Sequence, residues 1–185
     1  MRAVHKSILD AVLQIKPPPT ALLDIGCGNG SFTRVLCHYL PGTSVTGLDL
    51  SLPRYLTVAT DIRFVEGSVE RLPFSSASFD LATASLSMHH WVDKGKGISE
   101  LARVLREGGH LVIGDPLLHG WLGNPRLGRL AQRIDRGSFA SVPELEGYLR
   151  DSGFASFAIT LVPDSFKSTF LITAQKTLSS WASTV

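Results

Sequence analysis

The sequence predicts an α/β fold in which a mostly parallel sheet of seven strands ends in an antiparallel hairpin and carries helices on both faces. Two observations support this prediction. Short apolar runs alternate with segments of helical periodicity, which is typical of parallel strands that are buried on both faces. The last two strand-like runs, 156–162 and 169–174, are separated by six residues, too few for a crossover helix, so they must pair antiparallel.

The alternation begins with an amphipathic helix. Val4, Ile8 and Val12 recur every fourth residue, and the prolines at 17–19 end the helix. A strand, a tight glycine turn and a second helix follow, which is the opening of an α/β unit. The predicted strands are 21–25, 44–48, 63–65, 79–86 and 110–114, and the predicted helices among them are 32–39 and 98–105.

The last third of the chain is predicted to add two helices before the hairpin. One has an apolar stripe between residues 127 and 134. The other begins at a capping-box spacing, Ser141 with Glu144, and ends near Gly153. The hairpin therefore follows a helical segment rather than another parallel strand.

The composition predicts a single domain over 1–185, because the chain has the usual length of one domain. The formal net charge of +2 gives no reason to expect nucleic acid or an anionic membrane as partner. The two cysteines offer neither a disulfide framework nor zinc-ligand spacing, so we expect no metal. No run approaches the roughly 18 apolar residues of a transmembrane segment, and we expect a cytoplasmic protein.

The most informative segment is the glycine loop that follows the first strand. Glycines at Gly26, Gly28 and Gly30 let the backbone turn tightly and approach a ligand. The N–H groups of the next helix favour a carboxylate or a phosphate in the same space. Alternatively, the glycines serve only to build a tight turn between strand and helix.

An acidic residue, Asp49, ends the second strand, and its two carboxylate oxygens match the cis-diol of a ribose. Alternatively, Asp49 caps the next turn with Ser51. A nicotinamide dehydrogenase would also have this acid, but Gly-x-Gly-x-Gly differs from the Gly-x-Gly-x-x-Gly of a dinucleotide site. Asp24 beside the loop is badly placed for a pyrophosphate but tolerable for a cationic ligand. Asp49 therefore indicates a nucleoside but not a particular one.

Five segments resemble the class I S-adenosylmethionine-dependent methyltransferases, in particular the type 11-like group that acts on small molecules. They are LLDIGCGNG at 22–30, VTGLDLS at 45–51, FVEGSVERLPF at 64–74, FDLATASLSMHHWVD at 79–93 and ELARVLREGGHLVIGD at 100–115. With LRDSGF at 149–154 and the hairpin, they cover nearly the whole chain in the family's order. The resemblance implies a Rossmann-like fold and S-adenosyl-L-methionine as cofactor.

The resemblance also implies a cofactor site, with Asp24 near the methionine ammonium group and Asp49 on the ribose, where Leu50 would contact adenine. Ser68 stands at the adenine edge where the family commonly has an aspartate, and Ser85 would face the sulfonium. The implied cofactor-binding residues are Asp24, Gly26, Cys27, Gly28, Gly30, Asp49, Leu50, Ser68, Val69 and Ser85.

Methyl transfer from a sulfonium is a direct displacement, so much of the catalysis can come from alignment of the reacting atoms. An oxygen or carbon nucleophile can also require a base, and the candidates are His90 and His89. Adjacent helical residues point about 100° apart, so at most one should face the methyl group. We favour His90, because relatives often carry a polar residue before an aromatic one there. Asp115 is a second candidate, and the alternative is a reaction that needs no side-chain base.

Residues 117–141 are the least regular part of the chain, and we expect them to form a substrate-recognition insertion. Four arginines there share one helical face, which either attracts an anionic substrate, an acidic carrier protein or a membrane surface, or is simply solvated. They are Arg126, Arg129, Arg133 and Arg136.

The function predicted from the sequence is methyl transfer to a small-molecule acceptor. The alternative is a catalytically degenerate protein of the same fold that binds the cofactor or a partner. An NAD(P)-dependent oxidoreductase is the weakest of the three, because the loop spacing and the hairpin disfavour it. The sequence leaves the oligomeric state open.

Overall fold

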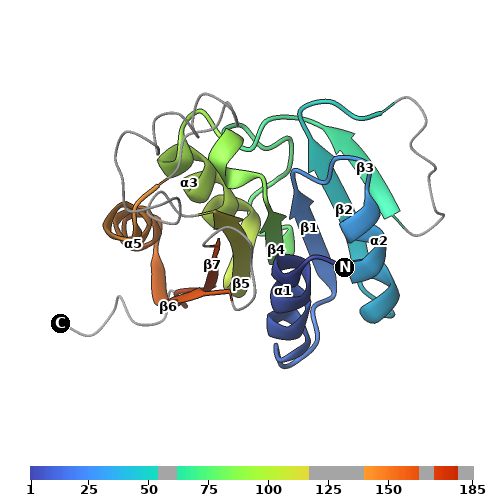
Figure 1. The fold of residues 1–185 in the computed structure, drawn as a ribbon, viewed down its shortest axis with the longest axis horizontal. Coiled ribbons are helices and arrows are strands. Elements are labelled where there is room, and N and C mark those ends of the chain that lie inside the picture. Colours follow the sequence, from blue (N-terminus) through green and yellow to red (C-terminus); the bar gives the residue numbers. More distant parts are fainter. Residues whose placement is uncertain (54–61, 117–139, 163–168, 179–185) are drawn as a thin grey trace.

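A computed structural model of the chain describes residues 1–53, 62–116, 140–162 and 169–178. Within these ranges a seven-stranded sheet has the strand order β3-β2-β1-β4-β5-β7-β6 (Figure 1). The strands are β1 (Ala21–Ile25), β2 (Ser44–Asp49), β3 (Ile62–Glu66), β4 (Phe79–Ser85), β5 (Leu105–Pro116), β6 (Phe154–Leu161) and β7 (Thr169–Lys176). The helices are α1 (Ala3–Leu13), α2 (Ser31–Tyr39), α3 (Lys94–Val104) and α5 (Val142–Asp151), with a short 3-10 helix, η1 (Met88–His90).

The strand directions confirm the predicted fold class. Strands β1 to β5 pair parallel, and β7 pairs antiparallel with both β5 and β6. In the register of the sheet, Ile25 at the end of β1 lies beside Leu48 of β2 and Ala84 of β4. The loops that leave these three strands therefore start at the same edge of the sheet.

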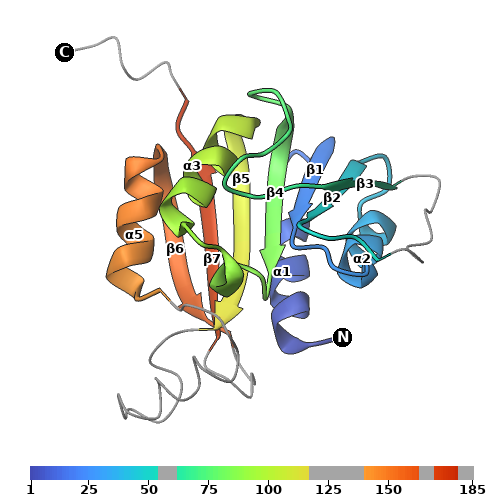
Figure 2. The same ribbon diagram turned by 90° about the horizontal axis from the view of Figure 1, so that it is seen from above.

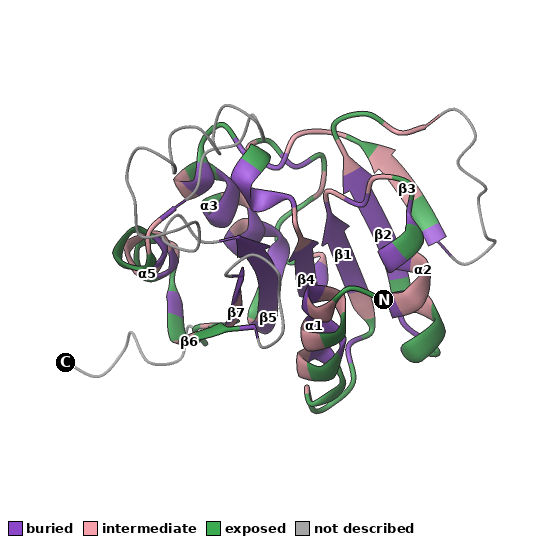
Figure 3. Ribbon diagram, in the orientation of Figure 1, coloured by how far each residue is buried: buried purple, intermediate pink, exposed green. Residues whose placement is uncertain are grey.

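Each face of the sheet has its own apolar core. Helices α1 and α2 cover one face, where Ile8 and Leu36 are fully buried, and α3 and α5 cover the other, where Leu101 and Leu149 are fully buried (Figure 2). The central strands are buried, whereas the edge strand β6 is largely exposed (Figure 3). The apolar strands and amphipathic helices of the sequence therefore correspond to a sheet that is covered by helices on both faces.

The boundary between α3 and β5 differs from the prediction. The predicted helix 98–105 includes Leu105, but α3 ends at Val104 and β5 already starts at Leu105. Leu105 is extended, with φ −75° and ψ 139°, and pairs with Phe79, where the register between β4 and β5 shifts. Leu105 is fully buried, so it extends the apolar stripe of the helix without being helical.

The capping-box prediction for α5 is confirmed. The backbone N–H of Ser141 donates to Glu144 Oε2 at 2.8 Å, and the Ser141 hydroxyl donates to the same oxygen at 2.6 Å. The four arginines and nearly all of the expected insertion lie outside the described residues. No helix in the described part of the chain is long and apolar enough to span a bilayer.

Candidate functional site

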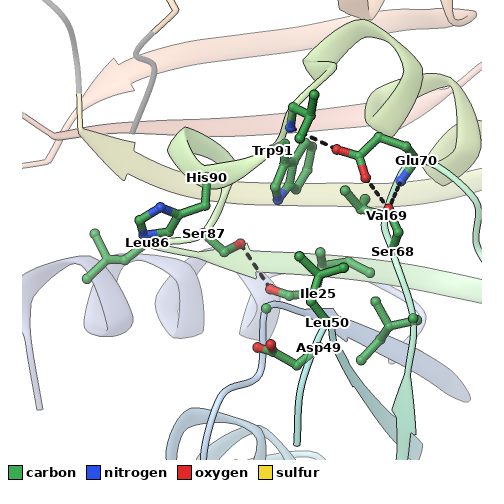
Figure 4. A pocket seen from close by; sticks show the side chains of 14 residues that line it. Ile25, Asp49, Leu50, Ser68, Val69, Glu70, Leu86, Ser87, His90 and Trp91 are labelled. Carbon is green, nitrogen blue, oxygen red and sulfur yellow. Dashed lines mark hydrogen bonds between the residues drawn. The ribbon is translucent and has the colours of Figure 1, made fainter. Parts of the chain in front are cut away.

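A cavity of about 290 Å³ opens at the sheet edge where β1, β2 and β4 end (Figure 4). Six predicted site residues line it: Gly26, Asp49, Leu50, Ser68, Val69 and His90. The other lining residues are Ile25, Leu48, Gly67, Glu70, Leu86, Ser87, Trp91 and Val92. Asp49 lies between the two ends of the cavity, with His90 at one end and Ser68 at the other.

The glycine loop is fastened to the end of β2. The backbone N–H groups of Gly26 and Cys27 donate to the carbonyl of Leu48 at 2.7 and 3.1 Å. Gly26 has φ +70°, and a Cβ there would lie 2.3 Å from the Cβ of Ser87. Gly28 has φ +53°, and no described atom would come within 4 Å of an added Cβ. The loop is therefore closely packed at Gly26 and open at Gly28, where a ligand can approach the backbone.

The Asp49 carboxylate holds the glycine loop and caps the turn at Ser51. Its Oδ2 accepts a hydrogen bond from the Gly28 N–H at 2.8 Å, and its Oδ1 accepts a long one of 3.3 Å from the Ser51 N–H. Each carboxylate oxygen has a second lone pair. The contacts hold the carboxylate at the cavity wall and leave it able to accept from two hydroxyl groups.

Asp24 lies beneath the glycine loop and does not line the cavity. Its side chain is buried and accepts from the hydroxyls of Thr33 at 2.7 Å and Thr83 at 2.9 Å, which ties β1 to α2 and β4. Burial raises its pKa to about 6, and the charge of Asp49 adds to this, although both threonine hydrogen bonds oppose it. Burial also raises the pKa of Cys27 to about 12, so this thiol stays neutral.

The raised pKa of Asp24 predicts a loss of stability as the pH increases. The folded chain binds the Asp24 proton more tightly than the unfolded chain, so the stabilisation is complete below pH 3.8 and is lost as the pH rises through about 6. A shift of this size corresponds to about 3 kcal/mol. We expect Asp24→Asn to remove this part of the pH dependence in denaturant unfolding between about pH 4 and 7. Asp10→Asn, on the exposed side of α1, is the control, and parallel wild-type and Asp24→Asn curves would refute the prediction.

Ser85 also lies outside the cavity lining, at the end of β4. Its Oγ is buried and has no hydrogen-bond partner within the described part of the chain. Leu86 and Ser87, which follow it, do line the cavity. Buried hydroxyls normally have a partner, so an unpaired one at this edge is compatible with a polar ligand.

The two histidines of η1 have different surroundings. His90 is exposed and lines the cavity, whereas His89 is buried, with its Nδ1 2.9 Å from Oδ1 of the buried Asp115. The two rings are 4.0 Å apart between centroids and tilted by 43°. Burial raises the pKa of Asp115, while its hydrogen bond with His89 opposes that shift. Asp115 is thus a partner of His89 and does not itself line the cavity.

Sequence reasoning missed Glu70 and Ser87. Glu70 accepts from the Val92 N–H at 2.9 Å and from the Ser68 hydroxyl, and Ser87 donates to the carbonyl of Ile25 at 3.1 Å. Glu70 lies two residues after Ser68 in the segment FVEGSVERLPF, so a charged side chain so close to a predicted site residue could have been recognised as a candidate. Ser87 carries no such signal, because only the fold brings it onto the glycine loop.

The fold and the cavity together define a class of protein. The sheet order reverses between β1 and β4, and the loops after these strands meet at the cavity. Open α/β sheets bind their ligands at such a point, and a carboxylate at the end of the second strand suits a ribose. The molecule has the architecture of a nucleoside-binding α/β protein, and its antiparallel β7 distinguishes it from an all-parallel sheet.

Comparison with known proteins identifies the family. A family model described as a methyltransferase domain matches residues 23–113. O-methyltransferase cnsE of Penicillium expansum is 31% identical over 168 residues, which are 85% of this chain and 60% of that protein. O-methyltransferase rstn1 of Aspergillus nomiae is 30% identical over 153 residues, which are 78% of this chain and 68% of that protein.

A solved structure shares the fold. Geranyl diphosphate C-methyltransferase of Streptomyces coelicolor, in complex with Mg²⁺, geranyl diphosphate and S-adenosyl-L-homocysteine, has 19% identity and a TM-score of 0.77. The similarity covers 94% of this chain and 78% of that one. The chain belongs to the class I S-adenosylmethionine-dependent methyltransferases. It spans about 60% of the length of cnsE.

Proposed function

We propose that this chain binds S-adenosylmethionine and transfers its methyl group to a small-molecule acceptor by direct displacement. The observation that carries the proposal is the placement of Asp49 in the cavity wall, between Ser68 at one end and His90 at the other (Figure 4). The two relatives are both named as O-methyltransferases, which supports methyl transfer as the reaction. When bound, the cofactor supplies an electrophilic methyl group on a sulfonium.

The residues present fit such a ligand. Asp49 can accept from both ribose hydroxyls, and the apolar side chain of Leu50 offers a surface for the base. The open space at Gly28 allows the amino-acid portion to approach the loop backbone. Asp24 provides a buried carboxylate beneath the loop, where its charge acts on a nearby ammonium group without direct contact.

We assign His90 as the candidate general base. It lines the end of the cavity away from Ser68, so a nucleophile there would have the imidazole within the same space. His89 packs against it and is itself held by Asp115. The pair would therefore limit the positions that the His90 ring can adopt, which favours alignment of the reacting groups.

We further propose that residues 117–141 complete the acceptor site. The segment follows directly in the sequence after Asp115 and Pro116, which end β5, and Asp115 contacts His89 of η1. Its arginines suit an anionic acceptor. A cytoplasmic location is part of the same proposal, because the acceptor and the cofactor would both be small soluble molecules.

Ligand-dependent thermal unfolding tests the cofactor assignment. A ligand at about 100 times its Kd stabilises a protein by about 2.7 kcal/mol, which raises the Tm of a domain of this size by about 5–10 °C. We expect this shift with S-adenosylmethionine and with S-adenosylhomocysteine, and none with NADH or NADPH. A shift with the nicotinamides alone would instead favour the oxidoreductase. Binding without turnover across a panel of hydroxylated acceptors would favour the degenerate, cofactor-binding alternative.

A further inference from the structure

Ser68 and Glu70 form a hydrogen-bonded pair in the wall of the cavity, at the end away from His90 (Figure 4). The Ser68 hydroxyl donates to Oε2 of Glu70, and the backbone N–H of Glu70 donates to Ser68 Oγ at 3.1 Å. A serine hydroxyl has one hydrogen and two lone pairs. Since the hydrogen and one lone pair are used within the pair, Ser68 Oγ can only accept from a ligand.

Glu70 is fixed in an orientation that maintains this arrangement. Its Oε1 accepts from the backbone N–H of Val92 at 2.9 Å, in the loop between η1 and α3. Burial tends to raise the pKa of Glu70, but the hydrogen bonds from Ser68 and from backbone N–H groups outweigh it and hold the pKa below the ordinary value. An ionised carboxylate has no hydrogen to donate. The Ser68 hydrogen must therefore point toward Glu70 and not into the cavity.

We propose that Glu70 determines which purine the cavity accepts, by forcing Ser68 to act as a hydrogen-bond acceptor and so selecting a 6-amino purine over a 6-oxo purine. The inference rests on the proposed function, because it needs the nucleoside base at the Ser68 end of the cavity. A ribose held by Asp49 would have its base beside Leu50, toward the Ser68 end of the cavity. The cavity wall next to Ser68 is apolar, because Val69 lines it. Ser68 and Glu70 are thus the polar side chains that meet the polar edge of the base.

The same geometry explains how this chain can lack an aspartate at position 68. A carboxylate at that position would accept from the amino group directly. Here the carboxylate stands two residues later and acts through the hydroxyl, so Glu70 is a positioning residue for Ser68. The charge of Glu70 also strengthens the acceptor, because hydrogen-bonded groups polarise one another.

The test compares two ligands that differ at the 6-position of the purine, S-adenosylhomocysteine and S-inosylhomocysteine, by isothermal titration calorimetry. S-inosylhomocysteine has a carbonyl in place of the 6-amino group of adenine, so Ser68 Oγ would face another hydrogen-bond acceptor. We expect the wild-type protein to bind S-adenosylhomocysteine at least about tenfold more tightly, since the 6-oxo ligand loses one well-placed hydrogen bond and also brings two acceptors into opposition.

Glu70→Gln is the decisive variant. The glutamine amide can donate to Ser68, which frees the serine hydrogen to point toward the ligand. We expect the preference for the 6-amino ligand to fall to about threefold or less. Ser68→Asp in the Glu70→Gln background places a carboxylate directly at the base, so we expect it to restore at least about tenfold discrimination. Such recovery would not follow from a purely structural role of Glu70.

Ser51→Ala is the matched control, since it removes a hydroxyl beside the site from a residue that does not line the cavity. It should keep the wild-type ratio of affinities. An unchanged ratio in Glu70→Gln, or equal affinities of the wild-type protein for the two ligands, would overturn this inference while leaving the cofactor assignment intact. Failure of the wild-type protein to bind S-adenosylhomocysteine at all would overturn the proposed function, and the inference with it.

Discussion

Replacing Asp49 by alanine is expected to weaken the binding of S-adenosylhomocysteine by about 100-fold or more. The carboxylate is held in the cavity wall by the Gly28 N–H and has lone pairs for both hydroxyls of a ribose. Hydrogen bonds to a charged group contribute about 1.5–3 kcal/mol each, and about 1.4 kcal/mol changes an affinity tenfold. Titration calorimetry of the wild-type and variant proteins measures the loss directly.

The control for this variant removes an equal charge elsewhere. Asp10→Ala lies on the exposed side of α1, away from the cavity, and should leave the affinity within about twofold of the wild-type value. The Tm of Asp49→Ala without ligand should change little, because the hydrogen bonds that its carboxylate accepts among the described residues come from two adjoining loop N–H groups, those of Gly28 and Ser51. An affinity within about fivefold of the wild-type value would show that Asp49 does not hold the ribose.

Replacing Gly26 by alanine is expected to destabilise the fold by about 2–5 kcal/mol. The residue has φ +70°, a conformation that costs a side-chain-bearing residue about 1–2 kcal/mol. The added Cβ would also lie 2.3 Å from the Cβ of Ser87, whose hydroxyl is bonded to the Ile25 carbonyl. Overpacking of this kind costs about 1–3 kcal/mol. Denaturant unfolding measures the total change.

Gly28→Ala separates the two contributions, because Gly28 also has a positive φ but no described atom within 4 Å of its added Cβ. We expect a loss of only about 1–2 kcal/mol there, combined with weaker ligand binding, since the methyl group would fill the space that a ligand needs. The double variant Gly26→Ala/Ser87→Gly should recover part of the lost stability. Equal destabilisation by Gly26→Ala and Gly28→Ala would contradict the assigned contact with Ser87.

Local patterns determined most of the fold. Residues 21–25 and 44–48 had to be buried strands, because apolar runs of that length between turn signals have no other stable position in an α/β domain. The short link between the last two strands fixed their antiparallel pairing, since a parallel pair needs a long crossover. Glycine spacing and the acid at Asp49 then indicated where a nucleoside would lie.

Local sequence patterns did not decide the structure where a residue suits two structural environments equally well. Leu105 continues the apolar stripe of α3, yet it is equally well buried as the first residue of β5, where it pairs with Phe79 of β4. Likewise, the adjacent histidines were equivalent in sequence. Only the path of η1 puts His90 in the cavity wall and turns His89 toward Asp115 at the end of β5.

By itself, then, the sequence determined the sheet, its closing hairpin and the strand ends at which the site lies, because these follow from the periodicity of burial and from connection length. The tertiary structure decided which side chains meet across that edge. Ser87 against Gly26 is a contact between segments about sixty residues apart, and its existence depends on the register of β1 against β4. Ser68 and Glu70 are close in sequence, but the orientation of the Glu70 carboxylate toward Ser68 is fixed by the Val92 N–H, which the fold brings to its other oxygen.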